Sequence, residues 1–139
     1  MGSATTLATF NVRADKTRSR NRILYDERRK RGFSYAVEGE KLARSVDVRA
    51  ALWGVPRLTI DQQGFGLAVR MKRVGRGECS PSAFLDGFQM DLETASSLPP
   101  TAYRAIEVYT TPFTVPPEFV TGTGLNCGVM LFWTKRVPW

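Results

Sequence analysis

The chain has 139 residues, of which 42% are hydrophobic and 24% charged, and its formal net charge is +7. This length suits one domain with its own core, and the composition is typical of globular proteins and not of disordered ones. The chain contains no histidine, which excludes the Ser-His and Cys-His types of catalysis, and no apolar run approaches the roughly 20 residues of a transmembrane helix.

Residues 1–18 are expected to form an N-terminal extension. Within it, Leu7 to Val12 alternates apolar and polar side chains, as an edge strand does. The segment has no positive stretch followed by an apolar one, so we see no secretory signal in the sequence as given. We therefore expect either a cytoplasmic protein or a mature or recombinant form.

Positive charge is concentrated in residues 13–31, which carry nine basic and three acidic side chains. The basic ones are Arg13, Lys16, Arg18, Arg20, Arg22, Arg28, Arg29, Lys30 and Arg31. Such a cluster attracts acidic protein surfaces, anionic lipid or nucleic acid. Nucleic acid is the least favoured of these, because few aromatic residues lie nearby and no nucleic-acid-binding motif accompanies the cluster. A solvated helix face is the alternative that needs no partner.

The basic residues fall on a predicted helix from Ser19 to Arg31. Ser19 is a suitable N-cap, cations fill the last turn, and Gly32 can close the helix. Ile23 and Leu24 give it only a narrow apolar stripe, so we expect it to pack at the periphery.

One or two further helices are predicted over Glu38 to Ser45 and Val46 to Trp53, ending at Gly54. Apolar residues recur there at spacings of three and four, which predicts a shared core-facing side. These residues are Leu42, Val46, Ala50 and Trp53.

The remaining pattern indicates strands joined by turns. The predicted strands are Phe33 to Val37, Leu58 to Asp61, Ala68 to Lys72, Ala83 to Asp86, Ile106 to Tyr109 and Cys127 to Thr134. The second and third form a hairpin through Gly64-Phe65-Gly66, Asp86 is a turn former, and Leu98 to Tyr103 is a short helix with proline in its first turn. The fold class is therefore α+β, with a small mixed β-sheet flanked by two or three short helices.

Catalysis finds little support in the sequence. The two cysteines are too far apart to form a zinc cluster, and Gly75 to Glu78 is a loop without a phosphate-binding motif. The carboxylates are scattered through turns and surface positions without a demonstrable pair: Asp86, Asp91, Glu93, Glu107 and Glu118. We expect no enzyme activity, no catalytic residues, no metal and no cofactor.

Several segments follow one another in the order of a known family. They are Arg28-Arg29-Lys30-Arg31-Gly32-Phe33, Val48 to Pro56, Ala83-Phe84-Leu85-Asp86-Gly87, Leu98-Pro99-Pro100, Ile106-Glu107-Val108-Tyr109, the loop Pro112 to Gly124, and Cys127 to Thr134. This order resembles the plug domain of TonB-dependent outer-membrane receptors over about residues 19–136. Two segments depart from the family pattern, Tyr103-Arg104-Ala105 and Thr110-Thr111-Pro112, and they put receptor-type partner contacts in question.

The resemblance implies a disulfide between Cys79 and Cys127, because plug sequences of this kind pair a cysteine in an Arg-Gly-x-Cys loop with one in a Cys-Gly-Val turn. Closing that loop would restrict the unfolded chain by about 4 kcal/mol. Such a bond needs an oxidising compartment, which would place the protein in the periplasm. Two unrelated buried thiols are the alternative.

The resemblance also implies a non-catalytic role, because a plug acts together with a barrel. We expect a periplasmic, peripherally membrane-associated structural subunit that docks on protein subunits of a larger membrane or cell-envelope complex, such as a respiratory or photosynthetic one. The alternatives are a plug domain or fragment of a TonB-dependent outer-membrane transporter, and a basic nucleic-acid-binding protein. Anionic lipid is a further possible contact.

Two sets of residues are predicted to bind the partner. The basic set is Arg18, Arg20, Arg22, Arg28, Arg29, Lys30 and Arg31. The apolar set is Trp133 with the C-terminal tail of residues 137–139, Val137, Pro138 and Trp139. The alternative for the tail is that it folds back on its own domain.

Overall fold

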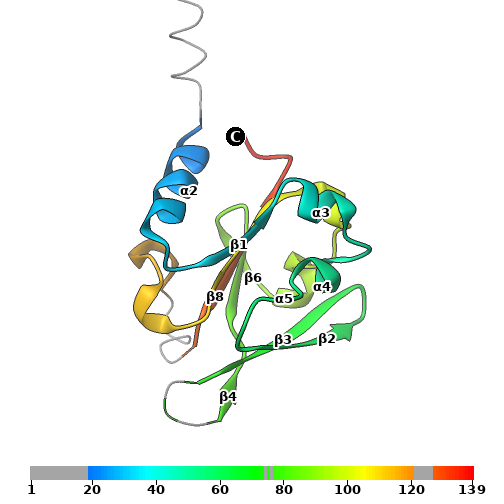
Figure 1. Cartoon of the computed structure of the whole chain (residues 1–139), viewed down its shortest axis with the longest axis vertical. Helices are drawn as coiled ribbons and strands as arrows, with labels where there is room; N and C mark the ends of the chain where they lie inside the picture. The colour runs from blue at the N-terminus through cyan, green and yellow to red at the C-terminus, as the bar shows by residue number, and fades with distance from the viewer. Residues whose placement is uncertain (1–18, 74, 76, 121–126) are drawn as a thin grey trace, which may run out of the picture.

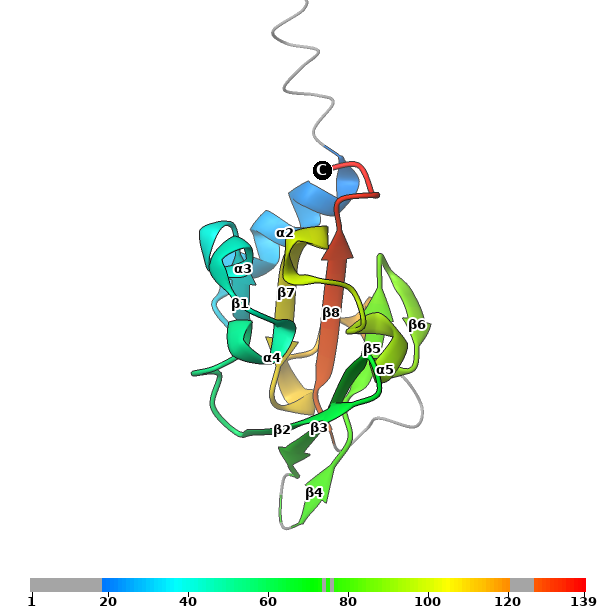
Figure 2. The same cartoon turned by 90° about the vertical axis from the view of Figure 1, so that its right-hand side faces the viewer.

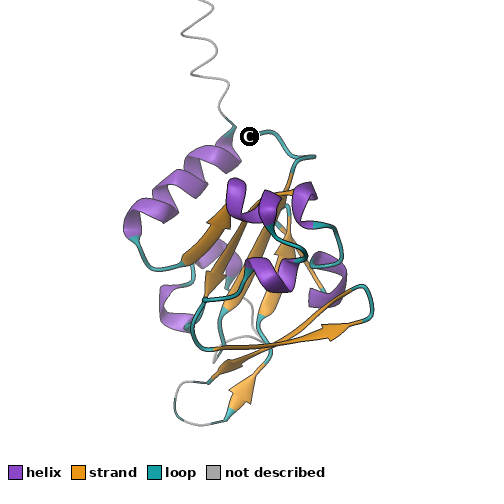
Figure 3. Cartoon of the chain, turned by 45° about the vertical axis from the view of Figure 1, so that its right-hand side comes forward, coloured by secondary structure: helices purple, strands orange, loops and turns teal. Residues whose placement is uncertain are grey.

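The computed structural model describes residues 19–73, 75, 77–120 and 127–139. The predicted edge strand Leu7 to Val12 and the basic residue Arg18 lie outside these ranges. The predicted α+β class is confirmed: helices lie on both sides of a mixed sheet (Figures 1 and 3).

The main sheet has five strands in the order β1-β7-β8-β5-β6. Its strands are β1 Tyr35–Glu38, β5 Ser82–Leu85, β6 Phe88–Met90, β7 Tyr103–Tyr109 and β8 Val129–Thr134. β5 and β8 run parallel and the other neighbours are antiparallel, so the sheet is mixed as predicted. The central β8 is buried along its whole length, which explains its continuous apolar sequence.

A second sheet of three strands, in the order β2-β3-β4, lies beside the first. It consists of β2 Leu58–Gln63, β3 Gly66–Lys72 and β4 Glu78–Cys79. The predicted hairpin is confirmed, but the prediction that all strands share one sheet is wrong. A disulfide joins Cys79 on β4 to Cys127 just before β8, with a Cα–Cα distance of 5.9 Å, and so links the two sheets as the resemblance implied.

The helices divide between the two faces of the main sheet (Figures 1 and 2). They are α2 Arg20–Arg31, α3 Glu40–Arg44, α4 Val48–Ala51 and α5 Leu92–Ala95, with short 3-10 turns η1 Pro100–Ala102, η2 Pro112–Thr114 and η3 Pro117–Phe119. Strand residues alternate between the faces, so each face has its own core cluster. Met130 and Phe132 of β8 pack with α3, α4 and α5, whereas Leu131 and Trp133 pack on the side of α2.

The face predicted for α3 and α4 is wrong beyond Leu42. Val46 and Trp53 are 90% and 79% exposed, and Val48, Ala51 and Leu52 enter the core instead. The reason is that the helix is interrupted: Ser45 ends α3, and the side chain of Asp47 caps a new helix. The spacing of three and four residues that starts at Leu42 therefore does not continue through the break, and it predicts the wrong buried side for α4.

Asp86 makes the predicted turn but also a contact that the sequence did not predict. Its backbone has a φ of 52°, a left-handed conformation that Asp tolerates better than most residues. Its carboxylate, however, accepts from the backbone N–H and the hydroxyl of Thr134, both at 2.7 Å. Asp86 therefore ties the end of β5 to the end of β8.

Candidate interaction surface

Helix α2 carries the basic cluster, and its ends are fixed as the sequence predicts. The hydroxyl of Ser19 accepts from the N–H of Arg22 at 3.0 Å, and Gly32 closes the helix with a φ of 74°. Four basic residues occupy the last turn, where the helix dipole favours positive charge.

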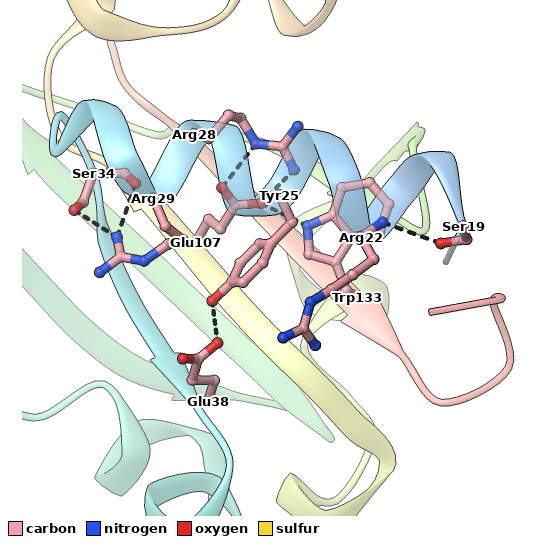
Figure 4. Close-up of polar contacts among 9 residues, drawn as sticks. All are labelled: Ser19, Arg22, Tyr25, Arg28, Arg29, Ser34, Glu38, Glu107 and Trp133. Carbon is pink, nitrogen blue, oxygen red and sulfur yellow. Dashed lines mark hydrogen bonds and ion pairs between the residues drawn. The ribbon is translucent and has the colours of Figure 1, made fainter. Parts of the chain in front are cut away.

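The inner side of α2 is anchored by a buried ion pair (Figure 4). Arg28 donates from Nε and Nη2 to the two carboxylate oxygens of Glu107 on β7, at 2.9 and 2.8 Å. The side chain of Arg28 is 4% exposed and that of Glu107 is fully buried. The indole N–H of Trp133 on β8 donates to Glu107 Oε2 at 2.7 Å, so helix and both central strands meet at one carboxylate.

Aromatic rings surround this ion pair. The Arg28 guanidinium lies 5.6 Å from the ring centres of both Phe119 and Trp133, within the range of cation–π attraction. Burial by itself would lower the pKa of Arg28, but its hydrogen bonds to Glu107 and the charge of that carboxylate outweigh burial, and its pKa is raised. Arg28 therefore remains charged inside the domain.

Tyr25 provides a second anchor, one turn before Arg28. Its ring is buried and its hydroxyl donates to the carboxylate of Glu38 at the end of β1. Burial, followed by the hydrogen bond and negative charge of Glu38, raises the pKa of Tyr25. Together the two anchors hold α2 against β1 and β7.

These contacts correct two predictions. Arg28 was expected on the partner-binding surface, but it is turned inward and bonded within the domain. Glu107 was placed among surface or turn carboxylates, but it is the centre of the buried cluster. The sequence did contain a sign of this pairing, because Glu107 is a charged residue inside the otherwise apolar strand Ile106 to Tyr109. A carboxylate on a buried strand needs a cationic partner.

The C-terminal tail packs against its own domain. The hydroxyl of Ser19 donates to the carbonyl of Pro138 at 2.7 Å, and the ring of Trp139 lies 5.1 Å from Tyr25 and 6.0 Å from Trp133. Figure 2 accordingly shows the chain end beside the start of α2. The folded-back alternative therefore describes this structure, and Trp133 is a core residue of β8 that is only 3% exposed.

The outer side of α2 remains basic. Arg20, Lys30 and Arg31 are exposed there. Arg22 and Arg29 are half-buried, Arg22 pairing with Asp26 at 3.1 Å and Arg29 donating to the carbonyl of Ser34 at 3.0 Å. We call these five residues, Arg20, Arg22, Arg29, Lys30 and Arg31, the basic α2 face.

The basic α2 face borders two hollows. At the helix C-terminus, a hollow of about 230 Å³ is lined by Arg31, Phe33 and Phe113 among others. A second groove, of about 580 Å³, is lined by the basic residues Arg22, Arg104 and Lys135 and by the acidic residues Glu38 and Glu40. The first hollow thus combines basic and aromatic side chains, and the second combines basic and acidic ones.

Two further observations bear on function. Within residues 19–73, 75, 77–120 and 127–139, no group of three or more His, Cys, Asp or Glu side chains is placed to hold a metal ion. Across the same described ranges, none of the helices combines the length and the apolar character needed to cross a bilayer.

Comparison with known proteins gives a match in structure only. No family model matches the sequence, and no curated protein matches it. The closed-closed state of the RagAB peptide importer matches with a TM-score of 0.53 and 19% identity, over 73% of this chain and 12% of the importer chain. The open-open state of RagAB and the copper transporter OprC give TM-scores of 0.48 and 0.49, each at 19% identity. OprC is matched over 74% of this chain and 16% of its own.

We base the assignment of the fold on the match to the closed-closed state of RagAB, because its TM-score exceeds 0.5 and it covers most of the chain. Identity at this level shows a shared fold alone. RagAB is a TonB-dependent receptor, and the matched part is 12% of the importer chain. The expectation drawn from the order of motifs is thus confirmed at the level of architecture: the chain has the plug-like fold found in TonB-dependent receptors.

Proposed function

We propose that this chain is a non-catalytic, periplasmic interaction domain that docks through the basic α2 face on an acidic protein surface of a larger membrane-associated complex. The observation that supports this most directly is the anchoring of α2. Arg28 and Tyr25 fix the helix to the sheet, while Arg20, Lys30 and Arg31 remain exposed on its outer side. A charged surface held rigidly loses little entropy on binding and steers an oppositely charged partner.

The disulfide and the plug-like fold support the location. A bond between Cys79 and Cys127 is stable in oxidising compartments and rare in the cytosol. The likeness to a TonB-dependent receptor suggests an outer-membrane or periplasmic context. Docking on a respiratory or photosynthetic complex is one form of this proposal, and anionic lipid is a further candidate contact for the same cations.

The test compares charge reversal on α2 with charge reversal elsewhere. The α2 variant combines Arg20→Glu, Lys30→Glu and Arg31→Glu, and the control variant combines Arg44→Glu, Lys72→Glu and Arg73→Glu, which are also exposed. Each tagged protein is added to solubilised membranes, recovered, and its bound subunits identified by mass spectrometry. We expect the wild type and the control to recover the same complex and the α2 variant to lose it. Equal recovery by all three proteins, or recovery of no complex by any of them, would refute the proposal.

A second candidate function is favoured by the fold match itself: the chain is the plug of an outer-membrane transporter, or a fragment of one. The match to a small part of the RagAB importer chain supports it. The intact mass of the protein isolated from its native source decides this, because a transporter is much larger than 139 residues. The nucleic-acid alternative predicts DNA or RNA binding that survives physiological salt, whereas non-specific charge contacts weaken steeply.

A further inference from the structure

The three-stranded sheet has an open edge beside an apolar groove. β2 is at the end of the order β2-β3-β4, so among the residues that the structure describes one of its sides has no neighbouring strand. At six residues it is also longer than β1 and β6, the edge strands of the main sheet, which have four and three. An unpaired edge presents backbone donors and acceptors that can pair with another strand.

The hairpin turn determines which backbone groups face outward. Gly64 has a φ of 57° while Phe65 stays in the ordinary negative range, as in a type II′ turn closed by the pair Gln63–Gly66. In an antiparallel ladder, hydrogen-bonded and non-bonded pairs alternate from that closing pair. The even-numbered residues Leu58, Ile60 and Gln62 therefore direct their N–H and C=O groups away from β3.

Two of these residues, Leu58 and Ile60, also line the groove. The groove is a hollow of about 400 Å³, to which β2 contributes Leu58 and Ile60 and the segment just after α4 contributes Leu52 and Trp53. Trp53 is 79% exposed at its rim, although tryptophan is costly to leave in water. Exposed tryptophan beside an apolar pocket is the residue type that contributes most to binding interfaces.

The positive charge around the groove indicates that its partner carries an acidic residue. Arg49 is the one charged residue among those that line it, and Lys41 lies nearby, donating to the carbonyl of Trp53 at 3.4 Å. Among the described residues, no carboxylate lies within ion-pair distance of Arg49. A partner with apolar side chains for the groove and a carboxylate for Arg49 would satisfy both features.

We propose that the β2 edge is a second docking site, which takes an extended segment of a partner protein as an added strand. The segment alternates apolar residues, which enter the groove beside Trp53, with polar ones, and carries an acidic residue facing Arg49. Backbone pairing with Leu58, Ile60 and Gln62 gives affinity, and the groove gives selectivity. This site is separate from the basic α2 face and does not depend on the function proposed for that face.

The test uses a defined peptide as the probe. It has eight residues, three valines alternating with three threonines between two terminal glutamates, and its Kd for the full chain is measured by titration calorimetry. One control peptide has prolines in place of the two central residues, because proline cannot donate to a ladder. Another has lysines at its ends. We expect the probe to bind at least about tenfold more tightly than either control peptide, a difference of about 1.4 kcal/mol.

Matched variants locate the binding. Gln62→Pro removes an outward N–H without removing a bond to β3, and Trp53→Ala removes the rim of the groove; each should weaken probe binding about tenfold or more. Phe88→Ala, at a residue that is 75% exposed on the edge strand β6, should leave the Kd unchanged. Trp53 is exposed, so its replacement keeps the test valid even where Gln62→Pro lowers stability.

Several results would overturn the proposal. They are the absence of probe binding at 1 mM peptide, equal affinity for the proline control, and an unchanged Kd in Trp53→Ala. Dimerisation of the free chain through β2 would do the same, because the edge would then belong to a second copy. The α2 charge-reversal variant should bind the probe normally, so failure of this proposal and failure of the proposed function give different results.

Discussion

Removing only the cation of the buried Arg28–Glu107 pair should destabilise the protein more than removing both charges of the pair. In Arg28→Met, Glu107 stays fully buried, and among the described residues the indole N–H of Trp133 alone is left to stabilise its charge. Breaking a buried pair in this way typically costs about 3 to 5 kcal/mol. The sulfur-containing side chain of Met fills much of the space that Arg28 leaves, so loss of packing is a smaller part of the effect.

The double variant Arg28→Met with Glu107→Gln separates the effect of the unpaired charge of Glu107 from the effect of lost packing. The Gln side chain keeps an oxygen that can accept from Trp133, while no charge remains without a partner. We expect the double variant to be more stable than Arg28→Met alone, by about 1 to 3 kcal/mol, although it carries one more substitution. The order of the two stabilities is therefore the informative quantity.

Urea denaturation followed by tryptophan fluorescence measures both variants, with Trp133 reporting directly on the site. The midpoint should shift without a change in the slope, because the surface exposed on unfolding is nearly the same. Arg44→Met is the matched control, because Arg44 is 77% exposed and pairs with Glu40, which is 87% exposed. A cost below about 1 kcal/mol for Arg28→Met, or additive effects in the double variant, would show that the pair does not anchor α2.

Three further outcomes are expected. Reducing the Cys79–Cys127 bond should lower the free energy of unfolding by about 4 kcal/mol on the chain-entropy model, and an unchanged urea midpoint in reducing agent would contradict this. Trp139→Ala should lower the melting temperature by a few degrees, about 1 kcal/mol, because the ring packs on the domain itself; an unchanged melting temperature would mean that the tail is free in solution. Burial raises the pKa of Tyr103 and of Tyr109 to about 12, above the ordinary value of 10.0, so stability should hold below pH 10 and decline as pH rises through about 12. Absorbance at 295 nm measures this titration, and phenols that all ionise near pH 10 in the folded state would refute it.

The sequence predicted those features that depend on neighbours a few residues away. Ser19 and Gly32 mark the two ends of α2, and they could be predicted because capping depends only on the first and last turns of a helix. The hairpin of β2 and β3 was predicted for a similar reason, since the glycines at its turn lie between two strand patterns. The order of motifs then indicated the fold.

The errors concern contacts between distant parts of the chain. Arg28 looked like its basic neighbours because nothing local distinguishes a cation that meets a carboxylate 79 residues away. Val46 and Trp53 looked like core residues because their spacing continues that of Leu42, and the new cap at Asp47 changes the phase. The sequence also did not reveal that β2, β3 and β4 form a sheet of their own.

By itself, then, the sequence determined where the main helices and strands of this protein lie, their approximate ends and the plug-like class of fold. Only the tertiary structure decided which side of α2 is buried, that Arg28, Glu107 and Trp133 meet, and that the tail returns to the start of α2. The physical reason is range. Caps, turns and periodicity act over a few residues, whereas burial and ion pairing depend on which segments the topology brings together.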